Sequence, residues 1–346
     1  MVVIDMGDWK TRVGFANDDV PATTFFSRVG RTATQETEGP CVGDGVEEGV
    51  HTVSTPFPKG SPIHWENVEL LLRHVFGKRP GNVDSVVMSH PVVWDETALE
   101  TLNSLLTETL SIPAVTLLPS CVLALFASGR TSGLVVEGGA HDFVITPIID
   151  GTPVLDGIRV LGLGGCDLDQ AMHQQISPIL ADDPEYASKT DAERRNVARD
   201  VKEKLGYVAL DYDAECASSA ADNSTVWLSE GSPDQTRPSI GRPRFAVPEL
   251  LFSASPSSLP ALIAESISAC HPSDQPSLWG NCLLSGGSSL FPGLDTRLHS
   301  ELSELSKHHT PHHTPHHTVN IIAPPERALS PWIGGSILAA SLPSLP

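Results

Sequence analysis

Two stretches of the chain share one pattern of apolar and polar positions. Residues 2–15 form an apolar run that ends in Asp5 and Gly7, then a polar turn and a second short apolar run. Residues 134–145 repeat this order, with an acid and glycines between two apolar runs. Each stretch predicts a β-hairpin. A carboxylate and a glycine at a hairpin tip suit a phosphate group with its metal ion, because glycine lets the backbone approach oxygen atoms and the acid holds the cation through water.

Strand and helix patterns alternate between the two hairpins. Apolar residues recur at helical spacing over residues 65–76, and Asp95 is placed to cap the start of a second helix. Short apolar runs at residues 83–88 and 114–118 predict buried strands, and residues 121–128 predict a short helix. The pattern therefore indicates two similar α/β half-domains that face each other across a phosphate-sized cleft.

The alternation continues in the second half of the chain. Residues 153–160 predict a strand, and Asp167 is placed as the N-cap of the helix that follows a glycine turn. Residues 191–210 are densely charged, which is typical of a solvated helix with ion pairs one turn apart. Residues 282–294 read as a buried strand that enters a glycine turn before a helix. Such a turn is either a seat for a ribose or phosphate or an ordinary joint.

Composition narrows the class of protein. The 346 residues have room for about two domains, and the net charge is −20, from 42 acids against 22 bases. This charge argues against a nucleic-acid backbone or an anionic membrane as the main partner. The six cysteines show no C-x-x-C spacing, which favours free thiols in a reducing compartment. We see no signal-peptide pattern and expect no membrane span.

A histidine-rich tract occupies residues 308–318. Its prolines recur every four residues, so we expect its six histidines to lie on an extended, solvated loop. The tract is either a repeat-expanded surface loop or a weak site for zinc, copper or nickel, for which imidazole is a common ligand.

Several blocks of sequence match one known family, in that family's order, from residue 2 to about residue 340. They are VIDMG at 3–7, GFANDDVP at 14–21, VGR at 29–31, ASGRTSG at 127–133, RDVKEKLGYVALDY at 199–212, LSGGSSLFPG at 284–293, IAPPER at 322–327 and WIGGSILA at 332–339. On these blocks the chain resembles the actin family. The last three are typical of actins and actin-related proteins rather than of the wider kinase and chaperone superfamily.

The resemblance implies an α/β fold of two similar lobes with a nucleotide cleft between them. The expected parts are a first lobe of residues 1–128 and 319–346 with 31–60 as a reduced small subdomain, and a second lobe of residues 129–318 with about 165–250 as its peripheral subdomain and 306–318 as a His/Thr/Pro loop. Because the sequence ends at Pro346, we also expect it to lack the family's C-terminal helices.

The resemblance also implies that the cleft binds ATP or ADP weakly, with Mg²⁺ or Ca²⁺. Asp5 and Glu137 would face the water shell of the cation, and Gly7 and Gly139 would bring backbone amides to the phosphates, which Arg12 could also reach. The remaining expected binding residues are Lys202 and Glu203 beside the adenine and ribose, Gly165 near the ribose, and Gly286, Gly287 and Leu290 as the adenosine seat.

Departures from the family fall at the phosphate end of this site. Asp8 and Trp9 stand for a serine and a glycine, Glu137 and Ala140 for two aspartates, Ser120 for the glutamine that positions the attacking water, and Val144 for a nearby histidine. An ionised Asp8 about 4 Å from a phosphate charge costs about 4 kcal/mol at an effective dielectric of about 20. We therefore expect no catalytic residues, ADP-like nucleotide binding and slow or absent hydrolysis.

The segments that join actin subunits are also altered. The chain between Arg31 and Cys41 is short, and residues 253–269 lose an apolar plug pattern. We expect poor self-polymerisation and partners within a cytoskeletal or nuclear actin-related assembly, without direct contact to nucleic acid or membrane. The expected location is the cytoplasmic cytoskeleton, with the nucleus as an alternative. The alternative function is an active ATPase or small-molecule kinase on the same scaffold, with Asp142 or Asp156 as the base.

Overall fold

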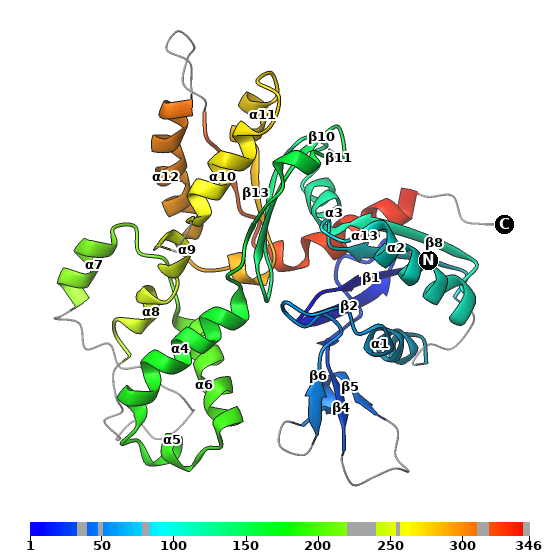
Figure 1. Ribbon diagram of the computed structural model, residues 1–346, viewed down its shortest axis with the longest axis horizontal. Helices are drawn as coiled ribbons and strands as arrows, with labels where there is room; N and C mark the ends of the chain where they lie inside the picture. Colours follow the sequence, from blue (N-terminus) through cyan, green and yellow to red (C-terminus); the bar gives the residue numbers. More distant parts are fainter. Residues whose placement is uncertain are drawn as a thin grey trace.

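Two mixed β-sheets, each flanked by helices, make up most of the molecule (Figure 1). The computed structural model describes residues 1–32, 40–47, 51–77, 83–219, 240–253, 257–309 and 318–341. We call the part built on the first sheet the first lobe and the part built on the second sheet the second lobe. The boundaries expected for them in the sequence stay a prediction.

The first lobe has a five-stranded sheet in the order β3-β2-β1-β7-β8. Its strands are β1 (Val2–Met6), β2 (Lys10–Phe15), β3 (Thr23–Phe26), β7 (Ser85–His90) and β8 (Ala114–Pro119). Strand β1 pairs antiparallel with β2 and parallel with β7, and all of its residues are buried. The predicted first hairpin is confirmed, and its tip follows a strand covered on both faces.

Helices cover both faces of this sheet. Helix α1 (Trp65–Gly77) buries Val68 and Leu71, as its spacing predicts, and α2 (Glu96–Ser104) starts at Asp95, whose Oδ1 accepts a hydrogen bond from the Ala98 N–H at 2.8 Å. A π-helical turn, η2 (Leu105–Thr109), continues α2. On the other face, α3 (Ser120–Ala127) packs on α13 (Ser330–Ser341). The indole of Trp332 in α13 donates to the Val3 carbonyl at 3.2 Å.

A small three-stranded sheet projects from the first lobe (Figure 1). It consists of β4 (Val29–Arg31), β5 (Cys41–Val42) and β6 (Thr52–Ser54), with a 3₁₀ turn at η1 (Gly43–Gly45). The bounds expected for a reduced small subdomain here, residues 31–60, stay a prediction.

The second lobe repeats the strand relations of the first. Its sheet runs β11-β10-β9-β13-β14, with β12 also paired to β10. The strands are β9 (Gly133–Gly138), β10 (Phe143–Ile149), β11 (Thr152–Pro153), β12 (Arg159–Leu161), β13 (Cys282–Ser285) and β14 (Ile321–Ile322). Strand β9 pairs antiparallel with β10 and parallel with β13, as β1 does with β2 and β7. The second hairpin is thus also confirmed.

Helices surround this second sheet and extend away from it. They are α4 (Gly165–Leu180), α5 (Pro184–Ser188), α6 (Asp191–Leu205), α7 (Tyr212–Ser219), α8 (Pro243–Ala246), α9 (Leu250–Ser253), α10 (Leu259–Ser268), α11 (Gln275–Trp279) and α12 (Leu294–His309), with 3₁₀ turns at η3 (Leu155–Gly157), η4 (Gly287–Ser289) and η5 (Arg327–Leu329). The charged helix α6 carries the predicted ion pairs one turn apart, Asp191 with Arg195 and Asp200 with Lys204.

Two predictions about local structure were wrong. Residues 153–160 do not form one strand, because the turn η3 separates β11 from β12. At this turn Gly157 lies so close to the sheet that a Cβ would meet the Pro147 ring at 2.5 Å. Asp167 is not an N-cap: α4 already begins at Gly165, and the Asp167 carboxylate accepts the Gly164 N–H from within the first turn at 2.8 Å.

The histidine tract was expected to be extended throughout. Helix α12 instead runs to His309, so the first two histidines continue that helix. Residues 310–317, which hold the rest of the tract, lie outside the described residues. In the described part of the chain, no helix combines the length and apolar character needed to cross a bilayer.

Candidate functional site

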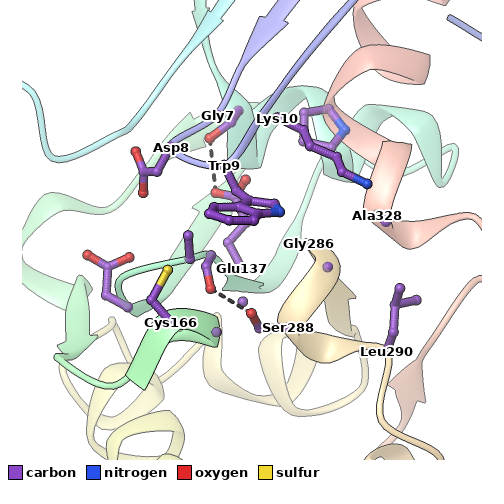
Figure 2. A pocket seen from close by; sticks show the side chains of 18 of the residues that line it. Gly7, Asp8, Trp9, Lys10, Glu137, Cys166, Gly286, Ser288, Leu290 and Ala328 are labelled. Atoms are coloured by element: carbon purple, nitrogen blue, oxygen red, sulfur yellow. Dashed lines mark hydrogen bonds between the residues drawn. The ribbon is translucent and has the colours of Figure 1, made fainter. Parts of the chain in front are cut away.

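The two hairpin tips line one cavity between the lobes. Its volume is about 490 Å³, and its wall also includes parts of α6 and of the turn η4. Figure 2 shows the first tip, with Gly7, Asp8 and Trp9, lying across from Gly286 and Ser288. All residues expected to bind a nucleotide line this cavity: Asp5, Gly7, Arg12, Glu137, Gly139, Gly165, Lys202, Glu203, Gly286, Gly287 and Leu290. The structure brings them together, and their roles in binding stay predictions.

An ion pair within the first hairpin lines the cavity. Asp5 and Arg12 lie directly opposite each other on β1 and β2, and the Arg12 guanidinium contacts Asp5 Oδ2 at 2.7 Å. The Ser89 hydroxyl on β7 donates to Asp5 Oδ1 at 2.6 Å. Both carboxylate oxygens of this buried acid therefore have protein partners, and the Arg12 charge is already paired with a carboxylate.

Acids from both hairpins share the phosphate end of the cavity. Burial raises the pKa of Glu137 to about 8, although the Ser120 hydroxyl donates to Glu137 Oε2 at 3.0 Å and opposes that shift. Burial, with repulsion from Asp142 and Asp5, raises the pKa of Asp8 to about 7. The pKa of Asp142 is raised as well, again mainly by burial. Asp8 and Glu137 thus retain protons toward neutral pH, where ordinary Asp and Glu side chains are ionised.

The amides of the two tip glycines close their own turns. The Gly7 N–H donates to the Lys10 carbonyl at 3.1 Å, and the Gly139 N–H donates to the Asp142 carbonyl at 2.8 Å. Among the described residues, no group of three His, Cys, Asp or Glu side chains is placed to hold a metal ion. Because both tip amides are engaged, they are less available to an anionic phosphate than the hairpin pattern alone suggested.

The opposite end of the cavity is built from small residues. Gly286 has φ +84°, and a Cβ there would lie 2.3 Å from the Gly138 carbonyl oxygen, so this position requires glycine. The Ser288 hydroxyl donates to the Gly139 carbonyl at 2.6 Å and ties η4 to the second hairpin (Figure 2). The space beside Gly287 is open. This end of the cavity therefore has room for an uncharged ring system.

Helix α6 delivers Lys202 and Glu203 to the same end. The Lys202 ammonium is buried and contacts Asp169 Oδ1 at 2.7 Å and the Gly165 carbonyl at 3.2 Å. Leu290 is 43% exposed at the end of η4, which leaves an apolar side chain available to a ligand. The helix that reads as a solvated charged surface thus has one edge in the cavity.

Sequence reasoning missed two contacts that connect the lobes, one in the cavity wall and one outside it. The Arg199 guanidinium of α6 lies 4.1 Å from the centroid of the Trp9 indole, and the Lys59 ammonium contacts Asp167 Oδ2 at 2.7 Å. Arg199 begins the family block at residues 199–212 and Lys59 belongs to no motif, but for neither residue did the sequence signal the partner. Of the two bases considered for a kinase, Asp142 lines the cavity, whereas Asp156 is exposed on η3 and is not part of its wall.

The raised pKa of Glu137 predicts a pH-dependent stability. Because the folded state holds this proton and the unfolded chain releases it near pH 4.5, the free energy of unfolding falls as pH rises from about 4.5 to about 8. We expect Glu137→Gln to lessen this fall by more than about 1.4 kcal/mol, the value of one pKa unit. Denaturant unfolding at pH 5 to 9 measures it, with the exposed Glu100→Gln as control. Parallel profiles for all three proteins would contradict the assignment.

Comparison with known proteins agrees with this geometry. The family model described as "Actin" matches residues 1–345. A protein of Neurospora crassa named "Actin-like protein" is 31% identical over an alignment that covers 98% of this chain and 90% of that protein. These matches confirm the resemblance seen in the sequence and the actin-like, two-lobed α/β fold. The chain belongs to the actin family.

Proposed function

We propose that this protein is a non-hydrolysing actin-family subunit that serves as a structural part of a larger protein assembly, with a weakly bound, ADP-like nucleotide in its cleft. The observation that carries this proposal is the acidic, internally paired phosphate end of the cavity. There, Ser120 donates to Glu137 instead of presenting a long amide side chain to water, and the side chain of Val144 cannot hold or orient water.

The residues present fit only one half of a nucleotide with its cation. The small-residue end around Gly286 and Gly287 has room for adenosine. At the other end, Asp5 is bound by Arg12 and Ser89, and the pKa values of Asp8 and Glu137 are raised. A divalent cation with its water shell would face Asp5 and Glu137 if it entered with a nucleotide, but a protonated Glu137 contributes no charge to hold it. A bound cation would supply neutralisation of phosphate charge.

Family membership supports a cytoskeletal role, and the cleft supports a role without turnover. We propose that partners within a cytoskeletal or nuclear actin-related assembly bind this subunit, and that its main location is the cytoplasmic cytoskeleton. The net charge of −20 makes nucleic acid or an anionic membrane an unfavourable direct partner.

Phosphate release from Mg-ATP by the purified protein tests the absence of hydrolysis. We expect turnover indistinguishable from the buffer blank, because neither Ser120 nor Val144 can position the attacking water. The matched variant restores family residues through Asp8→Ser, Trp9→Gly, Ser120→Gln, Glu137→Asp and Val144→His, and we expect it to gain measurable turnover. Hydrolysis by the unmodified protein at the rate of a conventional actin assayed beside it would refute the proposal.

Self-assembly provides a separate test. The chain between Arg31 and Cys41 is too short to reach a neighbouring subunit as a long loop, so we expect the pure protein to stay in the supernatant in salt and Mg²⁺ conditions that polymerise conventional actin. High-speed sedimentation and electron microscopy measure this. Helical filaments of the pure protein would contradict the prediction.

A further inference from the structure

The Trp9–Arg199 stack and the Lys59–Asp167 ion pair join the two lobes, the stack within the cavity wall and the ion pair outside it. The first is the stack of Trp9, at the tip of the first hairpin, against Arg199 on α6, with 4.1 Å between the guanidinium carbon and the ring centroid. Phe26 holds the indole from its own lobe, edge to face, with ring centroids 5.3 Å apart. A guanidinium stacked on the face of a tryptophan ring is attracted by the electron density of that face. The Arg199 side chain thus anchors the tip of the first hairpin to the second lobe.

The second contact comes from the segment that follows the small sheet. Lys59 donates to Asp167 Oδ2 at 2.7 Å, in the first turn of α4, and to the Gly162 carbonyl at 3.0 Å, in the turn before that helix. The same Asp167 oxygen accepts the Gly164 N–H at 2.8 Å, so the acid is fixed by its own helix. Lys59 therefore binds a pre-oriented acceptor.

The cavity holds few positive charges that a phosphate could use. Three cations in its wall are already paired with carboxylates: Arg12 with Asp5 at 2.7 Å, Arg199 with Asp169 at 3.1 Å and Lys202 with Asp169 at 2.7 Å. The fourth, Lys10, lies over the Phe26 ring at 5.6 Å from its centroid. A phosphate bound by Arg12, Arg199 or Lys202 would share that cation with a carboxylate that already partly neutralises its charge.

The acidic side chains in the cavity wall also disfavour the binding of a phosphate. Asp8, Glu137 and Asp142 line the phosphate end, and each adds a negative charge there once it ionises. A phosphate brought to this end therefore meets either that repulsion or a neutral acid that cannot balance its charge. The small-residue end has no comparable cluster of raised carboxyl pKa values and suits a flat base with an uncharged sugar.

We propose that the cleft selects a nucleoside over a nucleoside triphosphate, because the Trp9–Arg199 stack in the cavity wall replaces the phosphates as a link between the lobes, with the Lys59–Asp167 ion pair as a second link outside the cavity. This inference rests on the adenosine seat of the proposed function, and it reverses the order of affinity expected for a phosphate-binding cleft. Each added phosphate weakens binding here.

Calorimetric titration of the purified full chain with adenosine, AMP, ADP and ATP, each with and without Mg²⁺, tests the order. We expect affinity to fall along this series, with ATP at least tenfold weaker than adenosine. ATP binding as tight as adenosine, or no detectable adenosine binding, overturns the inference. Tight ATP binding without phosphate release would overturn it while leaving the absence of hydrolysis intact, so the two proposals fail separately.

Variants at Asp8 and Trp9 test whether these side chains cause the order of affinity from adenosine to ATP. We expect Asp8→Ser with Trp9→Gly to bring ATP affinity to or above that of adenosine, and ATP with Mg²⁺ to raise the melting temperature of this variant but not of the unmodified protein. Asp8→Ser alone, which keeps the stack, serves if the double variant does not fold and should narrow the adenosine-to-ATP ratio. An unchanged ratio of adenosine affinity to ATP affinity in a folded variant counts against the inference.

A matched pair of lysine variants tests the contact between Lys59 and Asp167. Lys59→Ala removes a bond between lobes, whereas Lys204→Ala removes an ion pair with Asp200 within the exposed face of α6. We expect trypsin or amide exchange to detect opening of the cavity walls in Lys59→Ala only, with the change reversed by saturating adenosine. Equal behaviour of the two lysine variants would contradict the assignment of Lys59 as a link between lobes.

Discussion

The arrangement of the molecule depends on holding two acid-bearing hairpin tips against each other. Asp5, Asp8, Glu137 and Asp142 come from two separate sheets and line one cavity. Like charges at such a junction repel, and burial adds to the cost of ionising them. The structure meets this constraint in two ways: Arg12 and Ser89 bind Asp5, and the raised pKa values of Asp8 and Glu137 keep protons on those groups toward neutral pH.

This solution changes what the cleft can do within an otherwise ordinary actin-family scaffold. The strand relations are the same in both lobes, and the glycine turn at Gly286 keeps a conformation that only glycine accepts without strain. The differences are concentrated where phosphate and cation would lie. A scaffold can keep its shape while its cavity loses the groups needed for turnover, because fold and chemistry depend on different residues.

The fold could be predicted from the sequence because its signals are local. The apolar runs, the acid and the glycine of residues 2–15 and 134–145 mark each hairpin without reference to any other segment, and Asp95 marks a helix start in the same way. Contacts between distant segments were missed. The strand expected at residues 153–160 is interrupted because Gly157 packs on Pro147, and the start of α4 is set by the glycine turn before Asp167.

The sequence predicted which residues line the site, but not which of them contact one another. Family motifs pointed to Lys202 and Gly286 as parts of one cavity, and Trp9 stood out because its bulk departs from the family pattern. Arg199 lies in a family block and Lys59 in none, but neither signalled its partner, because that partner is brought near only by folding. Lys59 and Asp167, for example, are 108 positions apart. Sequence shows which residue types are present, and the structure shows which of them are already engaged.

The central claim is that the chain's own side chains occupy the place of the phosphates. An experimental structure determined from crystals grown with saturating Mg-ATP tests this most directly. Our account predicts that Trp9 stays stacked on Arg199 and that no β- or γ-phosphate lies between the two hairpin tips. A triphosphate seated between Gly7 and Gly139, with the Trp9 indole displaced from Arg199, would contradict it.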